Sequence, residues 1–83
     1  MNRAINTITQ LSEAPEYTQE DIIDLMDKLG ANEKAFALLM NVPASTVRQW
    51  MSGTVVPGTA SNRLMQIYDL FPQIVGKIIA ARL

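Results

Sequence analysis

The chain has 83 residues, 48% of them apolar, and a formal net charge of −1. A single small domain with a modest hydrophobic core is expected, and this composition excludes wholesale disorder. The sequence contains no cysteine and no histidine, which removes disulfides, thiolate metal sites, the commonest general base and the commonest metal ligand. We therefore expect no enzyme activity, no catalytic residues, no metal and no cofactor.

The composition also favours a cytoplasmic protein. An absence of cysteine suits a reducing compartment. Arg3 is not followed by an apolar segment, so no signal peptide is expected. No apolar run approaches the roughly 18 residues that a membrane span needs, so no membrane partner is expected either.

The charges are unevenly distributed along the chain. Residues 1–33 carry two basic and seven acidic side chains, a net of −5, whereas residues 34–83 carry five basic and one acidic, a net of +4. A basic face turned away from an acidic one is compatible with a polyanionic partner, and a scatter of solvated charges explains the same numbers. Charge alone leaves both interpretations open.

Residues 1–17 are expected to form a partly ordered arm. Ile5, Ile8 and Leu11 have helical spacing, but several Thr and Ser residues weaken a helix here and Pro15 would end it.

A first helix is predicted to begin after Thr18 and to end at Gly30. In "TQED" the Thr18 hydroxyl can cap the N–H of Asp21, and Gly30 is a natural left-handed stop. The buried stripe is formed by residues at helical spacing, namely Ile22, Leu25, Met26 and Leu29.

Two short helices follow, separated by a tight turn. Asn32 caps the second helix, and Asn41 ends it because Asn tolerates the left-handed conformation. Pro43 suits the first position of the third helix, and Gly53 closes it. The apolar stripes are Phe36, Leu39 and Met40 with the small Ala37, and then Val47, Trp50 and Met51.

Two more helices complete the predicted fold. Pro57 and Gly58 mark a loop, after which a fourth helix carries a stripe of Leu64, Ile67 and Tyr68. Pro72 starts a fifth helix. Its apolar residues recur at helical spacing and form a wide stripe, namely Phe71, Ile74, Val75, Ile78 and Ile79. Five helices and no convincing strand predict an all-α domain over residues 18–83.

The second and third helices carry a family resemblance. The stretch "LGANEKAFALLMNVPASTVRQWMSGTVVP" resembles the helix-turn-helix of the XRE group, which includes the lambdoid phage repressors and Cro proteins. The resemblance covers roughly residues 22–70 and implies a five-helix, lambda-repressor-like DNA-binding domain. It implies a helix-turn-helix at about 33–52 and a recognition helix at about 44–51. "RQWMSG" with "LFPQIVGKI" is most similar to antitoxin-type regulators of the HigA and NadS sort, which implies autoregulation and a cognate toxin.

One pair of positions supports this register. Many relatives in the group bury an arginine against a glutamate where this chain has Met26 and Met51. Replacing both members of a buried ion pair is often neutral, whereas losing one is costly. We therefore predict that Met26 and Met51 are in contact.

The resemblance implies double-stranded DNA as the partner. A recognition helix enters the major groove, and the matching base-facing positions are Ala44, Ser45, Arg48 and Gln49. Gln49 can pair with adenine, Arg48 with guanine or phosphate, and Ala44 with a thymine methyl group. The alternative for each of these residues is an ordinary exposed position on the protein surface that contacts no DNA.

The positions that contact phosphate in relatives match less well. Glu33 stands where a glutamine is usual, and a carboxylate repels phosphate, so Lys34 is a possible substitute. Pro43 replaces the usual hydroxyl residue, and the loop after Gly53 is not basic. The predicted phosphate contacts are Lys34, Thr46, Thr54, Asn62 and Arg63.

The C-terminal helix, 72–83, is a candidate dimer helix because an 83-residue monomer has little core to cover its apolar stripe. The predicted interface is Phe71, Ile74, Val75, Ile78 and Leu83. Completion of the monomer core is the alternative.

Two functions follow from these residues. The first is a sequence-specific transcriptional regulator, a homodimer that binds a palindromic operator in the nucleoid and represses transcription. A more specific version of this function is an antitoxin that regulates its own expression. The second is a protein-interaction module that keeps the fold but binds a toxin or another regulator instead of DNA.

Overall fold

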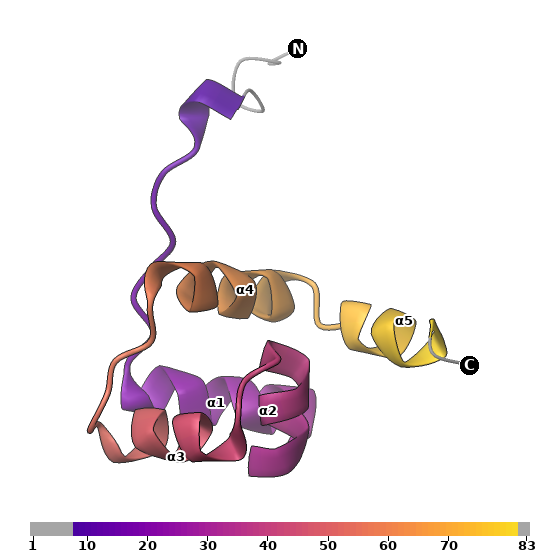
Figure 1. The fold of residues 1–83 in the computed structure, drawn as a ribbon. Coiled ribbons are helices and arrows are strands. Elements are labelled where there is room, and N and C mark those ends of the chain that lie inside the picture. The colour runs from indigo at the N-terminus through magenta and orange to yellow at the C-terminus, as the bar shows by residue number, and fades with distance from the viewer. Residues whose placement is uncertain (1–7, 82–83) are drawn as a thin grey trace.

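The computed structural model describes residues 8–81, which form five α-helices and one 3₁₀ helix, with no strand among them (Figure 1). The all-α prediction is therefore confirmed for this part of the chain. In chain order the elements are η2 (Ile8–Gln10), α1 (Gln19–Leu29), α2 (Glu33–Met40), α3 (Ala44–Ser52), α4 (Thr59–Leu70) and α5 (Ile74–Ala80). The first three α-helices pack together, α4 lies over them, and α5 extends beyond the end of α4.

The capping box predicted at the start of α1 is present. The Thr18 Oγ1 atom accepts a hydrogen bond from the Asp21 N–H at 3.2 Å, and the Asp21 carboxylate accepts one from the Thr18 N–H at 2.9 Å. Gly30 ends the helix with φ 67°, in the left-handed region that favours glycine. Local sequence thus determines both ends of α1.

A tight turn joins α2 to α3, as the sequence predicts. Asn41 has φ 58° and is the only non-glycine residue with positive φ in the described chain. The N–H groups of Asn41 and Val42 bond back to the carbonyls of Leu38 and Ala37. Pro43 lies one position before the expected place, because its ψ of 149° leaves it outside the helix as the N-cap of α3.

The core is built from one face of each of the first four α-helices. Ile22, Phe36, Val47 and Met65 are the largest fully buried side chains, one from each helix. The other buried apolar residues are Leu25, Met26, Ala37, Met40, Trp50 and Tyr68. The stripes predicted for α1, α2 and α3 supply nearly all of them.

The stripe predicted for α4 is correct in part, because Tyr68 is buried and Leu64 packs against the core cluster. Met65 is fully buried, whereas Ile67 is 37% exposed. The buried face follows Asn62, Met65 and Tyr68, which recur every three residues. Asn62 is the one polar residue among the buried side chains of the described chain, and a polar residue on the inner face conceals the stripe in the sequence.

Met26 and Met51 lie against the same core. Met26 is buried and Met51 is partly buried against the core cluster, and α1 packs on α3. Direct contact between the two thioethers stays a prediction.

The fifth helix begins two residues later than expected, because Pro72 and Gln73 form a turn and α5 starts at Ile74. None of its described residues is buried. Leu83, a predicted interface residue, and residues 1–7 of the predicted arm lie outside the described residues. No helix in the described part of the chain is long and apolar enough to cross a membrane.

Candidate nucleic-acid interface

The outer face of α3 presents a row of polar side chains. Ser45, Arg48 and Gln49 are exposed, whereas Val47 and Trp50 are buried against α1 and α2. The two sets alternate because a helix turns once every 3.6 residues. The buried pair thereby fixes the direction in which the polar row points.

Ala44 differs from the other three predicted base-contacting residues. Its side chain is partly buried and packs against the core cluster. Three of the four predicted residues therefore share the exposed face, and Ala44 lies at its inner edge.

The C-terminal end of α3 is attached to the start of α1. The side-chain Nε2 atom of Gln19 donates a hydrogen bond to the Met51 carbonyl at 3.0 Å. Gly53 ends α3 with φ 78°, and a Cβ atom placed there would lie 2.9 Å from the Gln19 side chain. The left-handed backbone conformation favours glycine at this position, and a larger residue would also have to displace the end of the flexible Gln19 side chain.

The polar row also contains an ion pair that spans the turn. The Arg48 guanidinium lies 3.5 Å from the carboxylate of Glu33, the first residue of α2. Both side chains keep considerable exposure, 58% for Arg48 and 42% for Glu33. An exposed pair contributes little to stability, so its main effect is on where the guanidinium points. In the sequence, only the acid at position 33, where the resemblance leads one to expect glutamine, points to this ion pair. Residue spacing alone does not identify Arg48 as the partner of Glu33.

Three predicted phosphate-contacting residues lie around this face. Lys34 is exposed in the first turn of α2, and Thr46 is partly buried in α3. The Thr54 hydroxyl shares a 2.8 Å hydrogen bond with the Ser52 hydroxyl just beyond the end of α3. All three come from α2, α3 or the loop that follows.

The two remaining predicted phosphate-contacting residues lie in α4 and contact the arm. Asn62 is only 5% exposed, and its side-chain oxygen accepts a hydrogen bond from the Tyr17 N–H at 3.1 Å. The Arg63 guanidinium donates to the Ser12 carbonyl and to the Gln66 side chain. Both residues therefore help to hold the arm, and their contact with phosphate stays a prediction.

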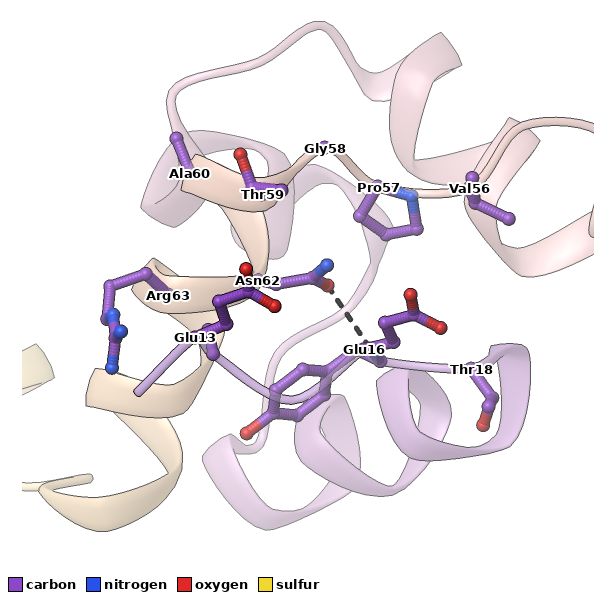
Figure 2. Close-up of a pocket in the computed structure, with 12 residues that line it drawn as sticks. Glu13, Glu16, Thr18, Val56, Pro57, Gly58, Thr59, Ala60, Asn62 and Arg63 are labelled. Atoms are coloured by element: carbon purple, nitrogen blue, oxygen red, sulfur yellow. Dashed lines mark hydrogen bonds between the residues drawn. The ribbon is translucent and has the colours of Figure 1, made fainter. Parts of the chain in front are cut away.

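A cleft separates this part of the arm from the start of α4 (Figure 2). It is lined by Glu13 and Glu16 of the arm, by the loop around Pro57, and by Asn62 and Arg63. Two carboxylates on its rim and an arginine already engaged by the chain make it unfavourable for a polyanion. The candidate interface is therefore the outer face of α3 and not this cleft.

A second set of contacts fastens the end of the arm. The Tyr17 hydroxyl donates to the Asp69 carboxylate at 3.0 Å, and the Lys28 ammonium donates to the same carboxylate at 2.8 Å. The hydrogen bond from Lys28 lowers the pKa of Asp69. The pKa of Tyr17 is raised to about 12. Burial is the larger cause, and the hydrogen bond to Asp69 is the second. This network joins the arm, α1 and α4, and no spacing in the sequence predicts it.

Exposed apolar side chains remain on α4, directly after it and on α5. We call them together the α4–α5 surface, and they are Ile67, Leu70, Phe71, Ile78 and Ile79. Of the predicted interface residues, Phe71 and Ile78 belong to it. Ile74 and Val75 instead pack partly against the core cluster. The first turn of α5 therefore packs against the core, and the same apolar stripe is exposed one turn later, at Ile78 and Ile79. A dimer interface on this helix stays a prediction.

The described residues contain no cluster of three or more acidic side chains placed to hold a metal ion. Comparisons of the chain with protein-family models, with curated proteins and with solved structures found no match.

Proposed function

We propose that this protein is a sequence-specific DNA-binding regulator with a lambda-repressor-like helix-turn-helix formed by α2 and α3. The observation that carries the proposal is the row of Ser45, Arg48 and Gln49 on the outer face of α3. Hydroxyl, guanidinium and amide groups are the ones that read base edges in the major groove. A short helix presented by a packed core is the shape that this groove accepts.

The proposed mode of binding uses two copies of the chain. One α3 helix with few cations gives a modest affinity, because phosphate contacts supply much of the binding free energy. Two copies related by a two-fold axis double the contacts and require a palindromic operator. The α4–α5 surface is the face of the described chain that a second copy would cover. The regulator would then repress transcription in the nucleoid. A more specific version of this proposal is an antitoxin that regulates its own expression.

A second function is favoured by a specific observation. The α4–α5 surface is apolar and uncovered, and Arg48 is already paired with an acid. Both features suit a module that holds another protein, such as a toxin, and binds DNA weakly or not at all.

Selection of duplexes from a random library by the wild-type protein separates these two functions. A regulator is expected to enrich one palindromic sequence. Loss of Arg48 or Gln49 through Arg48→Ala or Gln49→Ala is then expected to weaken binding to that sequence by about 1–3 kcal/mol each. Circular dichroism should show that both variants stay folded, since both side chains are exposed.

Two matched variants serve as controls. Lys77→Ala removes one cation from α5, and Gln73→Ala removes one exposed amide before α5. Neither residue lies on α3 or belongs to the apolar residues of the α4–α5 surface, so neither change is expected to affect binding to the enriched sequence. Failure to enrich any duplex, or unchanged binding by the Arg48 and Gln49 variants, would remove the regulator proposal in favour of the interaction module.

A further inference from the structure

The ion pair between Glu33 and Arg48 bears on how DNA would be discriminated. It joins the first residue of α2 to the middle of α3 at 3.5 Å, and both side chains are accessible to a ligand. Resting on the function proposed above, we infer that Glu33 is a specificity-determining residue. The Glu33 carboxylate leaves Arg48 able to bind the uncharged edge of a base. It disfavours contact between Arg48 and a phosphate.

The chemistry of the guanidinium explains the distinction. Arginine has five N–H donors in a planar fork, and Glu33 contacts the NH1 nitrogen. The other donors remain available to the two acceptors of a guanine edge, which carry no net charge. A phosphate in the same place brings a second negative charge next to the Glu33 carboxylate, and the two repel.

The position of Glu33 makes this repulsion relevant. In helix-turn-helix complexes the first helix crosses the DNA backbone while the second reads the bases. Glu33 begins the first of these helices, α2. A register that brings Arg48 to a phosphate therefore brings the Glu33 carboxylate to the backbone as well.

The consequence is a difference between specific and non-specific binding. Non-specific complexes depend almost wholly on cation–phosphate contacts, so the Glu33–Arg48 pair removes one cation from them. A complex in which Arg48 meets guanine retains the ion pair, so Arg48 still offsets the Glu33 charge beside the DNA backbone. Glu33 therefore lowers affinity for random DNA more than affinity for the correct sequence.

The test compares binding to a selected duplex and to a scrambled duplex of the same length and composition, measured by fluorescence anisotropy over a range of salt concentrations. Glu33→Gln is expected to bind the scrambled duplex on the order of fivefold more tightly at about 0.1 M salt. The slope of log Kobs against log salt concentration should steepen by about 0.9, as for one added phosphate contact. Binding to the selected duplex should change less, so the specificity ratio falls.

The matched control is Asp24→Asn, which raises the net charge by the same amount. Asp24 lies beside Tyr17 and Asp69 on the arm side of α1, so this change is expected to leave the ratio unaltered. A second background, Arg48→Ala, tests whether Glu33 acts through Arg48. There the Glu33→Gln change should no longer affect binding to the scrambled duplex.

Each other outcome is decisive. A Glu33→Gln variant that behaves like Asp24→Asn overturns the inference and leaves the proposed function standing. An effect that persists in the Arg48→Ala background also overturns it, because Glu33 then acts alone. A wild-type protein that binds neither duplex at low salt removes the proposed function, and the inference with it.

Discussion

Asn62 in α4 and Tyr17 at the end of the arm are joined by a hydrogen bond of 3.1 Å, across 45 residues of sequence. The Asn62 side chain is buried, so the Tyr17 N–H has a partner that is itself shielded from water. Together with the contacts of Arg63 and Asp69, this bond makes α4 the element that holds the arm against the domain.

Asn62→Ala is expected to lower the free energy of unfolding by about 1–3 kcal/mol, because the Tyr17 N–H loses its partner in a partly buried position. Urea unfolding measures this value, and limited proteolysis should show faster cleavage between Ser12 and Tyr17. Gln73→Ala, at an exposed position, is expected to stay within about 0.5 kcal/mol of wild type. Equal stability of the two variants would contradict the role given to Asn62.

The turn between α2 and α3 should tolerate glycine but not alanine at position 41. Asn41 has φ 58°, where a Cβ atom costs about 1–2 kcal/mol in residues other than Asn and Gly. Asn41→Gly is therefore expected to have nearly wild-type stability, and Asn41→Ala to be less stable by about 1 kcal/mol. Thermal unfolding compares the two, and an Asn41→Ala variant as stable as Asn41→Gly would show that the turn changes its conformation.

Stability should fall at alkaline pH because of Tyr17. Its pKa is about 12 in the folded protein against 10.0 for the free side chain. A group with a raised folded pKa contributes stability that is complete below its unfolded pKa and is lost as pH rises through the folded value. The free energy of unfolding should thus decrease between pH 10 and about pH 12.

Tyr17→Phe isolates this contribution. The variant is expected to be less stable than wild type near neutral pH but to lose less stability as the pH rises above 10. Burial also raises the pKa of Tyr68, so part of the alkaline loss remains. Parallel stability curves for the two proteins from pH 9 to pH 12 would contradict the assignment to Tyr17.

The α4–α5 surface should govern self-association. Ile78 is 42% exposed on this surface, so Ile78→Glu is expected to leave the fold intact and to shift the protein to monomer. Sedimentation at concentrations of tens of micromolar measures the change. Leu11→Glu is the control, because Leu11 is an exposed apolar residue of the arm, outside α4 and α5. A monomeric wild-type protein at these concentrations would oppose the homodimer.

Local sequence predicts the ends of the helices well. The Thr18 cap, the left-handed residues Gly30 and Asn41, and the end of α3 at Gly53 all depend on interactions within a few residues. Such interactions can be inferred without knowledge of the tertiary structure. The buried faces of α1, α2 and α3 follow from apolar spacing for the same reason.

Contacts between distant segments could not be predicted in this way. The pairing of Asn62 with Tyr17 depends on how the arm lies on α4, and a buried asparagine has no mark in the sequence that separates it from an exposed one. The pair between Glu33 and Arg48 depends on the angle between α2 and α3. Spacing therefore predicts which residues of α3 face outward but not which of them already have partners.

The attachment of Gln19 to the end of α3 has a consequence for how this chain can diversify. Gln19 holds the end of α3 through its hydrogen bond to the Met51 carbonyl and lies close to Gly53. Val47 and Trp50 hold the same helix by packing in the core. Positions 45, 48 and 49 take no part in that anchorage to the core. A lineage of such proteins is thus free to exchange the three outward residues, and so acquire new preferences, while the framework beneath them stays unaltered.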